Sequence, residues 1–178
     1  MRTSRSTKVL VPLATLLAAG VIAVGSGATF SSTTGNTISA ATSGTLTQSN
    51  SKAGQAVFNL DNLKPGDVLN GSLKLTNTGT LPANFSLTEV ASTNGFDGEN
   101  LKLVIKNTTK NTTVYSGTFG GLADGTKNTL GTWAAGEAND YTFTVTLDQA
   151  ASNTQQGKAA TATYTWDAVQ LDGTTTNQ

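Results

Sequence analysis

The sequence contains no cysteine and no histidine among its 178 residues. Without cysteine the chain can form neither a disulfide nor the lipid-modified cysteine of a lipoprotein, so its stability must come from a packed core or from assembly. Without histidine it lacks the commonest general base, the commonest transition-metal ligand and the usual pH switch near neutrality. These absences argue against hydrolase chemistry. We therefore expect no catalytic residue, no cofactor, no metal site and no enzymatic activity.

Arginine is almost absent, since it occurs only at Arg2 and Arg5. The chain has 11 Lys and Arg against 11 Asp and Glu, a formal net charge of +0. Both arginines and Lys8 precede the first apolar run, so the remainder of the chain is mildly acidic. Because nucleic-acid binding depends on clustered Lys and Arg, we expect no nucleic-acid partner.

One apolar run, Val9 to Val24, is almost unbroken, yet it is shorter than the roughly 20 residues that a membrane-spanning helix needs. It follows a basic head and precedes the small residues Gly25 to Ala28, which is typical of a signal peptide. We predict a signal peptide over residues 1–28, cleaved by a signal peptidase between Ala28 and Thr29, with no stable membrane anchor afterwards. An uncleaved anchor, lengthened by its flanks, is the alternative. Either reading predicts export of the remaining chain.

Residues 29–53 are rich in Ser, Thr, Gly, Asn and Ala and are predicted to form an extended N-terminal arm. Phe30, Ile38 and Leu46 share one parity, so an extended backbone would place their side chains on a single face. This pattern favours a strand that completes a sheet elsewhere. A solvated linker is the alternative.

Residues 54–172 show period-2 alternation between turn signals, which predicts short strands throughout. The clearest run is Tyr141 to Leu147, where large apolar residues alternate with threonine. The turn at Asn77–Gly79 predicts a hairpin between the strands on either side of it. Further expectations are a short strand at Val57–Leu60 and a short helix at Asp148–Asn153.

This pattern predicts an all-β fold, a jelly-roll-like antiparallel β-sandwich over residues 54–172, followed by a polar tail at residues 173–178. Sequence alone does not distinguish a jelly-roll strand order from an immunoglobulin-like one. A domain of this size is large enough to bury a single core.

Four stretches carry a resemblance to a known family: Gly27–Phe30, Ser43–Leu46, Phe58–Gly79 and Gln156–Gln170. Their order and spacing resemble those of the TasA/camelysin proteins, which are exported with a dedicated signal peptidase and build biofilm-matrix fibres in Gram-positive bacteria. No motif of the family aligns with residues 90–132.

The resemblance implies a jelly-roll subunit, secreted to the extracellular matrix or cell surface, whose arm inserts as a donor strand into the next copy of the chain. Strand addition to an open sheet edge supplies main-chain hydrogen bonds, and a head-to-tail contact grows a filament. On this reading Phe30, Ile38 and Leu46 are the donor side chains.

Two other functions fit the sequence less well. A monomeric surface adhesin could use the threonine-rich sheet faces or the loop Gly120–Asn128. A camelysin-like metalloprotease would need zinc ligands, and the chain has no His-Glu-x-x-His site because it has no histidine.

Overall fold

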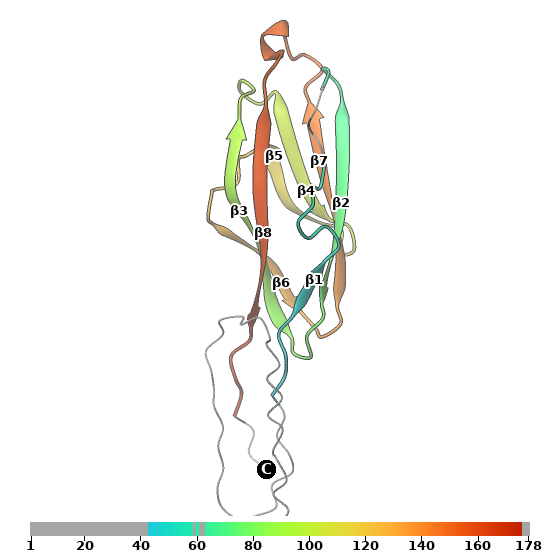
Figure 1. Cartoon of the computed structure of the whole chain (residues 1–178), viewed down its shortest axis with the longest axis vertical. Helices are drawn as coiled ribbons and strands as arrows, with labels where there is room; N and C mark the ends of the chain where they lie inside the picture. Colours follow the sequence, from blue (N-terminus) through green and yellow to red (C-terminus); the bar gives the residue numbers. More distant parts are fainter. Residues whose placement is uncertain (1–42, 59, 61–62, 176–178) are drawn as a thin grey trace, which may run out of the picture. The chain divides into compact units, whose positions relative to one another are not determined.

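A computed structural model describes residues 43–58, 60 and 63–175, and the fold is reported for these residues (Figure 1). Within them the chain forms eight strands and one 3₁₀ turn. The elements are β1 (Gln48–Asn50), β2 (Val68–Asn77), β3 (Ala83–Asn94), β4 (Leu101–Asn107), β5 (Thr112–Thr118), β6 (Lys127–Trp133), β7 (Ala138–Leu147), η1 (Asn153–Gln155) and β8 (Ala160–Gln170).

The strands form a five-stranded sheet in the order β1-β2-β7-β4-β5 and a three-stranded sheet in the order β6-β3-β8. Every pairing is antiparallel. Figure 1 shows β3 beside β8 and β7 beside β2. The antiparallel β-sandwich expected from the sequence is therefore confirmed.

The core lies between the two sheets and follows the alternation seen in the sequence. On β7, Tyr141, Phe143 and Val145 are fully buried, whereas the intervening threonines are half-buried. This is the burial pattern of an antiparallel strand that covers a core with one face. The remaining fully buried large apolar side chains come from both sheets and their connections: Leu75, Phe85, Leu87, Leu101, Leu103, Ile105, Phe119 and Trp133.

The predicted hairpin around Asn77–Gly79 is wrong, because β2 and β3 belong to different sheets. The Asn77 side-chain amide holds the connection that leads from one sheet to the other. Its Nδ2 donates to the carbonyls of Leu81 (2.9 Å) and Ala134 (3.1 Å), and its Oδ1 accepts from the Gly79 N–H (3.1 Å). In a hairpin, backbone groups of the turn would pair with one another. Here the buried Asn77 side chain is the hydrogen-bond partner of backbone groups in this connection.

Two smaller expectations also differ from the structure. The described residues of 57–60 form no strand, and the helix expected at residues 148–153 is replaced by the single 3₁₀ turn at Asn153–Gln155. In the part of the chain that the structure describes, no helix has the length and apolar character that crossing a membrane would require.

Candidate functional site: a groove between two sheet edges

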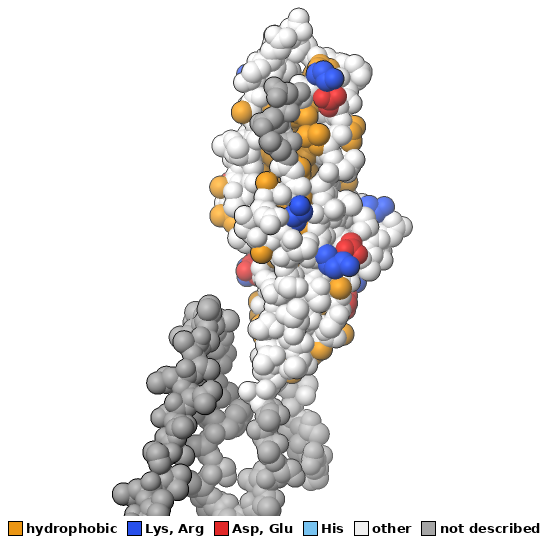
Figure 2. Space-filling view, turned by 45° about the vertical axis from the view of Figure 1, so that its right-hand side comes forward, with side chains coloured by type: hydrophobic (Ala, Val, Ile, Leu, Met, Phe, Trp, Pro, Cys, Tyr) orange, Lys and Arg blue, Asp and Glu red, His pale blue; other side chains and the backbone are white. Residues whose placement is uncertain are grey.

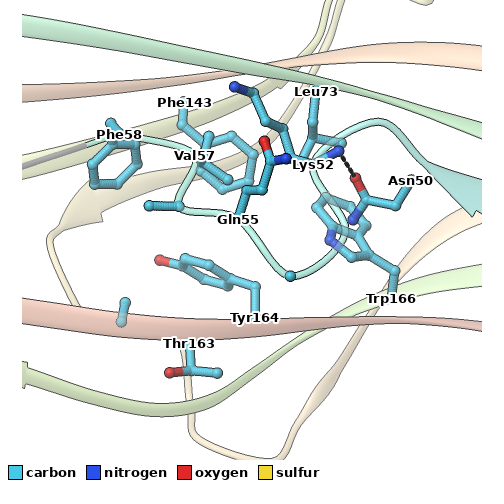
Figure 3. A pocket seen from close by; sticks show the side chains of 13 residues that line it. Asn50, Lys52, Gln55, Val57, Phe58, Leu73, Phe143, Thr163, Tyr164 and Trp166 are labelled. Carbon is cyan, nitrogen blue, oxygen red and sulfur yellow. Dashed lines mark hydrogen bonds between the residues drawn. The ribbon is translucent and has the colours of Figure 1, made fainter.

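The two sheets leave a groove where β2 and β8 lie at their margins. β8 is the last strand of the three-stranded sheet, and β2 is bordered on its outer side only by the short β1. A cavity of about 380 Å³ opens here. Figure 3 shows Tyr164 and Trp166 of β8 on one side of it and Leu73 and Phe143 on the other.

One edge of β8 is occupied by β3 from Ala160 to Gln170, and the other edge pairs with no strand of the described chain. The Ala159 carbonyl accepts from Gly95, next to β3, whereas the Trp166 carbonyl accepts from Gln48 Nε2 at 2.7 Å on the groove side. Because backbone groups alternate between the two edges of a strand, Ala162 and Tyr164 share the orientation of Trp166. The backbone N–H and C=O groups of these residues point outward from the open edge of β8. They are therefore available to pair with a further strand.

The opposite side of the groove is closed in part by residues 51–58, which we call the covering segment. Ser51 continues the pairing of β1, since its N–H donates to the Lys74 carbonyl at 3.0 Å and its Oγ accepts from the Lys74 N–H at 2.8 Å. Further along, Val57 passes close over Gly71 of β2, where an added Cβ would lie 2.5 Å from the Val57 carbonyl oxygen. The absence of a side chain at Gly71 therefore permits this close approach.

Side chains, rather than a strand ladder, hold the far end of the covering segment. Phe58 packs edge-on against Phe119 and at a tilt against Phe143, with ring centroids 6.3 Å apart in each pair. The backbone hydrogen bonds within the segment are local turns, from Ala53 to Asn50 and from Gln55 to Lys52. Aromatic packing of this kind contributes about 0.5–1.5 kcal/mol per pair beyond area burial.

Among the described residues, the groove lining holds one charged side chain, Lys52, alongside polar and apolar ones. On the face drawn in Figure 2, white atoms, which belong to uncharged polar side chains and to the backbone, predominate, and basic and acidic side chains occur in small sets. The largest exposed apolar side chains of the described residues, Val68, Val90 and Val169, are 47–54% exposed. A groove with aromatic and aliphatic walls, polar side chains and a single lysine suits an extended polypeptide better than a polyanion.

Of the residues predicted for assembly, the structure describes Leu46. It is half-buried against the core, in a segment whose backbone runs beside the β2–β3 connection. There Thr78 and Thr80 donate to the carbonyls of Thr47 and Thr45, both at 3.0 Å. This stretch and β1 both fall within the predicted arm, residues 29–53.

The other predicted site residues, Phe30 and Ile38 of the donor strand and Ala28 and Thr29 of the cleavage site, lie outside the described residues. Sequence reasoning missed the open edge of β8 and the role of Phe58. An isolated aromatic residue in a segment without alternation was the only signal for Phe58, and no local pattern reports that a strand lies at an edge.

A peptidase metal centre does not fit the residues that the structure describes. Zinc peptidase sites combine histidine or cysteine with carboxylate ligands, and the whole chain has neither histidine nor cysteine. Across the described ranges, no group of three or more potential ligand residues is placed to hold a metal ion.

Fold and groove together define an antiparallel β-sandwich with an open strand edge, a class of domain that can accept an additional strand. The family described as camelysin metallo-endopeptidase matches residues 7–100, just over half of the chain. The chain belongs to this family, the TasA/camelysin family. The match covers β1 to β3 and ends before β4. No curated protein matches the chain.

Proposed function

We propose that the chain is a secreted structural subunit that polymerises into extracellular matrix fibres. Each subunit would insert its N-terminal arm, freed by signal cleavage, into the groove of the next subunit. The observation that carries this proposal is the open β8 edge above a groove with apolar walls. A strand laid there gains main-chain hydrogen bonds along its length and a place for alternate side chains.

The arm region supports the same mode of binding. Gln48–Asn50 pair with Leu75–Asn77 as an edge strand, so the part of the arm nearest the domain already adds to a sheet margin. We propose Phe30 and Ile38 as the residues that enter the groove of the neighbouring subunit, where Tyr164, Trp166 and Leu73 would receive them. Such a contact joins two different surfaces, so each added subunit presents a free groove for the next arm, and a filament grows where the rotation between subunits does not close a ring.

We further propose that the protein is not a peptidase, in spite of the name of its family, because the chain offers no histidine or cysteine ligand. Two experiments test this. Elemental analysis of dialysed protein should find no stoichiometric zinc, and a casein assay should find no proteolysis. One zinc per chain, lost together with activity on chelation, would overturn the proposal.

Filament formation is tested by removing the arm residues proposed to insert. Deleting Thr29–Ser39, or replacing Phe30 and Ile38 with Asp, should leave a soluble, β-rich monomer that does not elongate. A charge forced into an apolar groove costs several kcal/mol unless it is neutralised. Electron microscopy of the purified mature protein measures the result.

The matched control places the same charges on the opposite face of the arm, at Ser31→Asp and Ser39→Asp, and should still form filaments. Filaments of normal length from the truncated chain would show that the contact lies on the folded domain instead. A monomeric adhesin, the alternative function, predicts that every variant and the parent remain single subunits.

A further inference from the structure

A second cluster of reactive side chains lies outside the groove lining, where the β4–β5 turn meets the start of β7. Lys110 is in the turn, and Glu137 and Asn139 flank the first residue of β7. Oε1 of Glu137 accepts from two groups at once, Lys110 Nζ at 2.7 Å and Asn139 Nδ2 at 3.0 Å. One carboxylate oxygen therefore joins a primary amine and a side-chain amide.

The Asn139 amide is fully buried, and its carbonyl oxygen is also engaged. Asn107, itself 2% exposed, donates from Nδ2 to Asn139 Oδ1 at 3.1 Å. A donor at this oxygen polarises the amide carbonyl and would stabilise negative charge that develops there.

Hydrogen bonds fix the turn that carries Lys110 to both β4 and β7. The Lys110 N–H donates to Asn107 Oδ1 at 2.9 Å, and the Thr108 N–H donates to the Asp140 carbonyl at 2.8 Å. On the other side Nζ of Lys110 lies 5.7 Å from the centre of the buried Trp133 ring. The Lys110 amine and the Asn139 amide nitrogen thus meet at one oxygen of Glu137, held by groups on β4, β6 and β7, which is the positioning that an intramolecular reaction exploits.

We propose that Lys110 and Asn139 join through an intramolecular isopeptide bond, with Glu137 as the group that moves the proton. Nothing in the family match bears on this cluster, because the match ends at residue 100. The proposal rests on the contacts among these side chains, and it is independent of fibre formation.

The reaction balances without a co-reactant. Glu137 takes a proton from the Lys110 ammonium, and the freed lone pair on Nζ attacks Cγ of Asn139. Oδ1 carries the negative charge of the tetrahedral intermediate, facing the Asn107 amide. Glu137 returns its proton to Nδ2 and takes the second proton from Nζ, which leaves Nζ as a neutral amide nitrogen. The Cγ–Nδ2 bond then breaks, and the departing nitrogen leaves as ammonia, which carries the second proton away from Glu137 as ammonium.

Glu137 is ionised, which is the form in which a carboxyl group can accept a proton. Burial on its own would raise the pKa of Glu137, but hydrogen bonds from Lys110, Asn139 and the Ala134 N–H together hold this pKa below its usual value of 4.5. The group is therefore a carboxylate near neutral pH. The Lys110 side chain is 38% exposed, which leaves ammonia a route to solvent.

Such a bond would tie the β4–β5 turn to β7 in a chain that has no cysteine for a disulfide. A covalent link between distant residues stabilises chiefly by restricting the unfolded state. It would also keep the outer hairpin attached to the sheet under a pulling force along a fibre.

Mass spectrometry of the full purified chain tests the proposal, once its mass no longer changes with time. We expect a mass lower than the sequence mass, at its determined N-terminus, by one ammonia. Trypsin should fail to cleave after Lys110, and a branched peptide should contain both Lys110 and Asn139. Lys110→Arg keeps the positive charge beside Glu137 and should show the full mass.

Two more variants separate the chemistry from the fold. Glu137→Gln keeps lysine and asparagine in place but cannot accept the proton, so the full mass is expected. Lys74→Arg changes a lysine that lies 3.7 Å from Asp140 at an exposed position and should retain the loss of ammonia. A parent at full mass with normal cleavage after Lys110 would overturn the proposal, as would ammonia loss mapped to another residue. A bond that still forms in Glu137→Gln would overturn the part assigned to Glu137.

Discussion

Glu89 is a fully buried acid on the core face of β3, and neither of its carboxylate oxygens has a hydrogen-bond partner among the described residues. It lies opposite Tyr164 in the β3–β8 register. Burial, and after it the neighbouring Glu89 side chain, raise the pKa of Tyr164 far above its usual value. A buried polar group without a partner costs about 1–3 kcal/mol, and more when it is charged.

We therefore predict that Glu89→Gln, which keeps nearly the same shape and brings an amide that can donate to the Tyr164 hydroxyl, raises the free energy of unfolding by about 1–3 kcal/mol. Denaturant unfolding at neutral pH gives the midpoint of unfolding and the slope of the unfolding free energy against denaturant concentration. The exposed Glu99→Gln is the control and should change stability by less than about 0.5 kcal/mol. A lower midpoint for Glu89→Gln would mean that the carboxylate has a favourable partner.

The raised pKa of Tyr141 leads us to predict that the free energy of unfolding falls at alkaline pH. Burial raises its pKa from 10.0 to about 12, although a hydrogen bond from Asn107 acts in the opposite direction. The folded pKa exceeds the unfolded one, so the stabilisation is complete below pH 10.0 and is lost as pH rises towards about 12. Unfolding midpoints should fall across this window, and Tyr141→Phe should reduce the slope. If the midpoint falls with pH as steeply in Tyr141→Phe as in the parent, the loss of stability comes from other groups, such as Tyr164.

At the scale of elements, the close contact between Gly71 of β2 and the covering segment can be broken by a substitution at Gly71. Gly71→Ala places a Cβ against the Val57 carbonyl, a backbone atom that cannot rotate away. We expect the covering segment to lift, so that amide exchange at residues 52–57 rises while exchange in β4 and β7 stays unchanged. Gly173→Ala, with open space around the added atom, is the matched control. Unchanged exchange in Gly71→Ala would show that β2 moves instead.

The elements differ in how well the sequence predicts them, for identifiable reasons. β7 is predictable because its alternation of large apolar residues and threonine matches one buried and one wet face. β6 was not predicted, because Trp133 is its only buried side chain and the strand carries little periodic signal. The β2–β3 connection was misassigned because alternation reports which face is buried but not which sheet a strand joins.

At the scale of the whole molecule, the sandwich was predictable and the groove was not. The groove exists because β8 pairs with β3 across a separation of dozens of residues, and because β1 covers only the last three residues of β2. Neither pairing has a local signature. The parity of Phe30, Ile38 and Leu46 indicates an extended strand that could pair with a sheet elsewhere, and the family resemblance implies the donor role, but the surface that would receive the strand depends on long-range strand order.

The acceptor side of the proposed fibre contact can be blocked without touching the arm. The Ala162 N–H points to the open edge of β8, so Ala162→Pro removes a donor that the β3–β8 pairing does not use. The variant should fold, and its intact arm should still insert into a parent subunit. The open edge of its own β8, however, should not pair with the arm of another subunit.

Mixing this variant with the parent therefore predicts capped filaments, whose mean length falls as the fraction of Ala162→Pro subunits rises. Electron microscopy of defined mixtures measures the length, and circular dichroism confirms that the variant is folded. Thr163→Pro is the contrasting variant, because the Thr163 N–H points towards β3 and its loss should disrupt the sheet itself. Filaments of unchanged length in mixtures with folded Ala162→Pro would place the acceptor surface away from β8, since a subunit that donates but cannot accept must terminate a head-to-tail polymer.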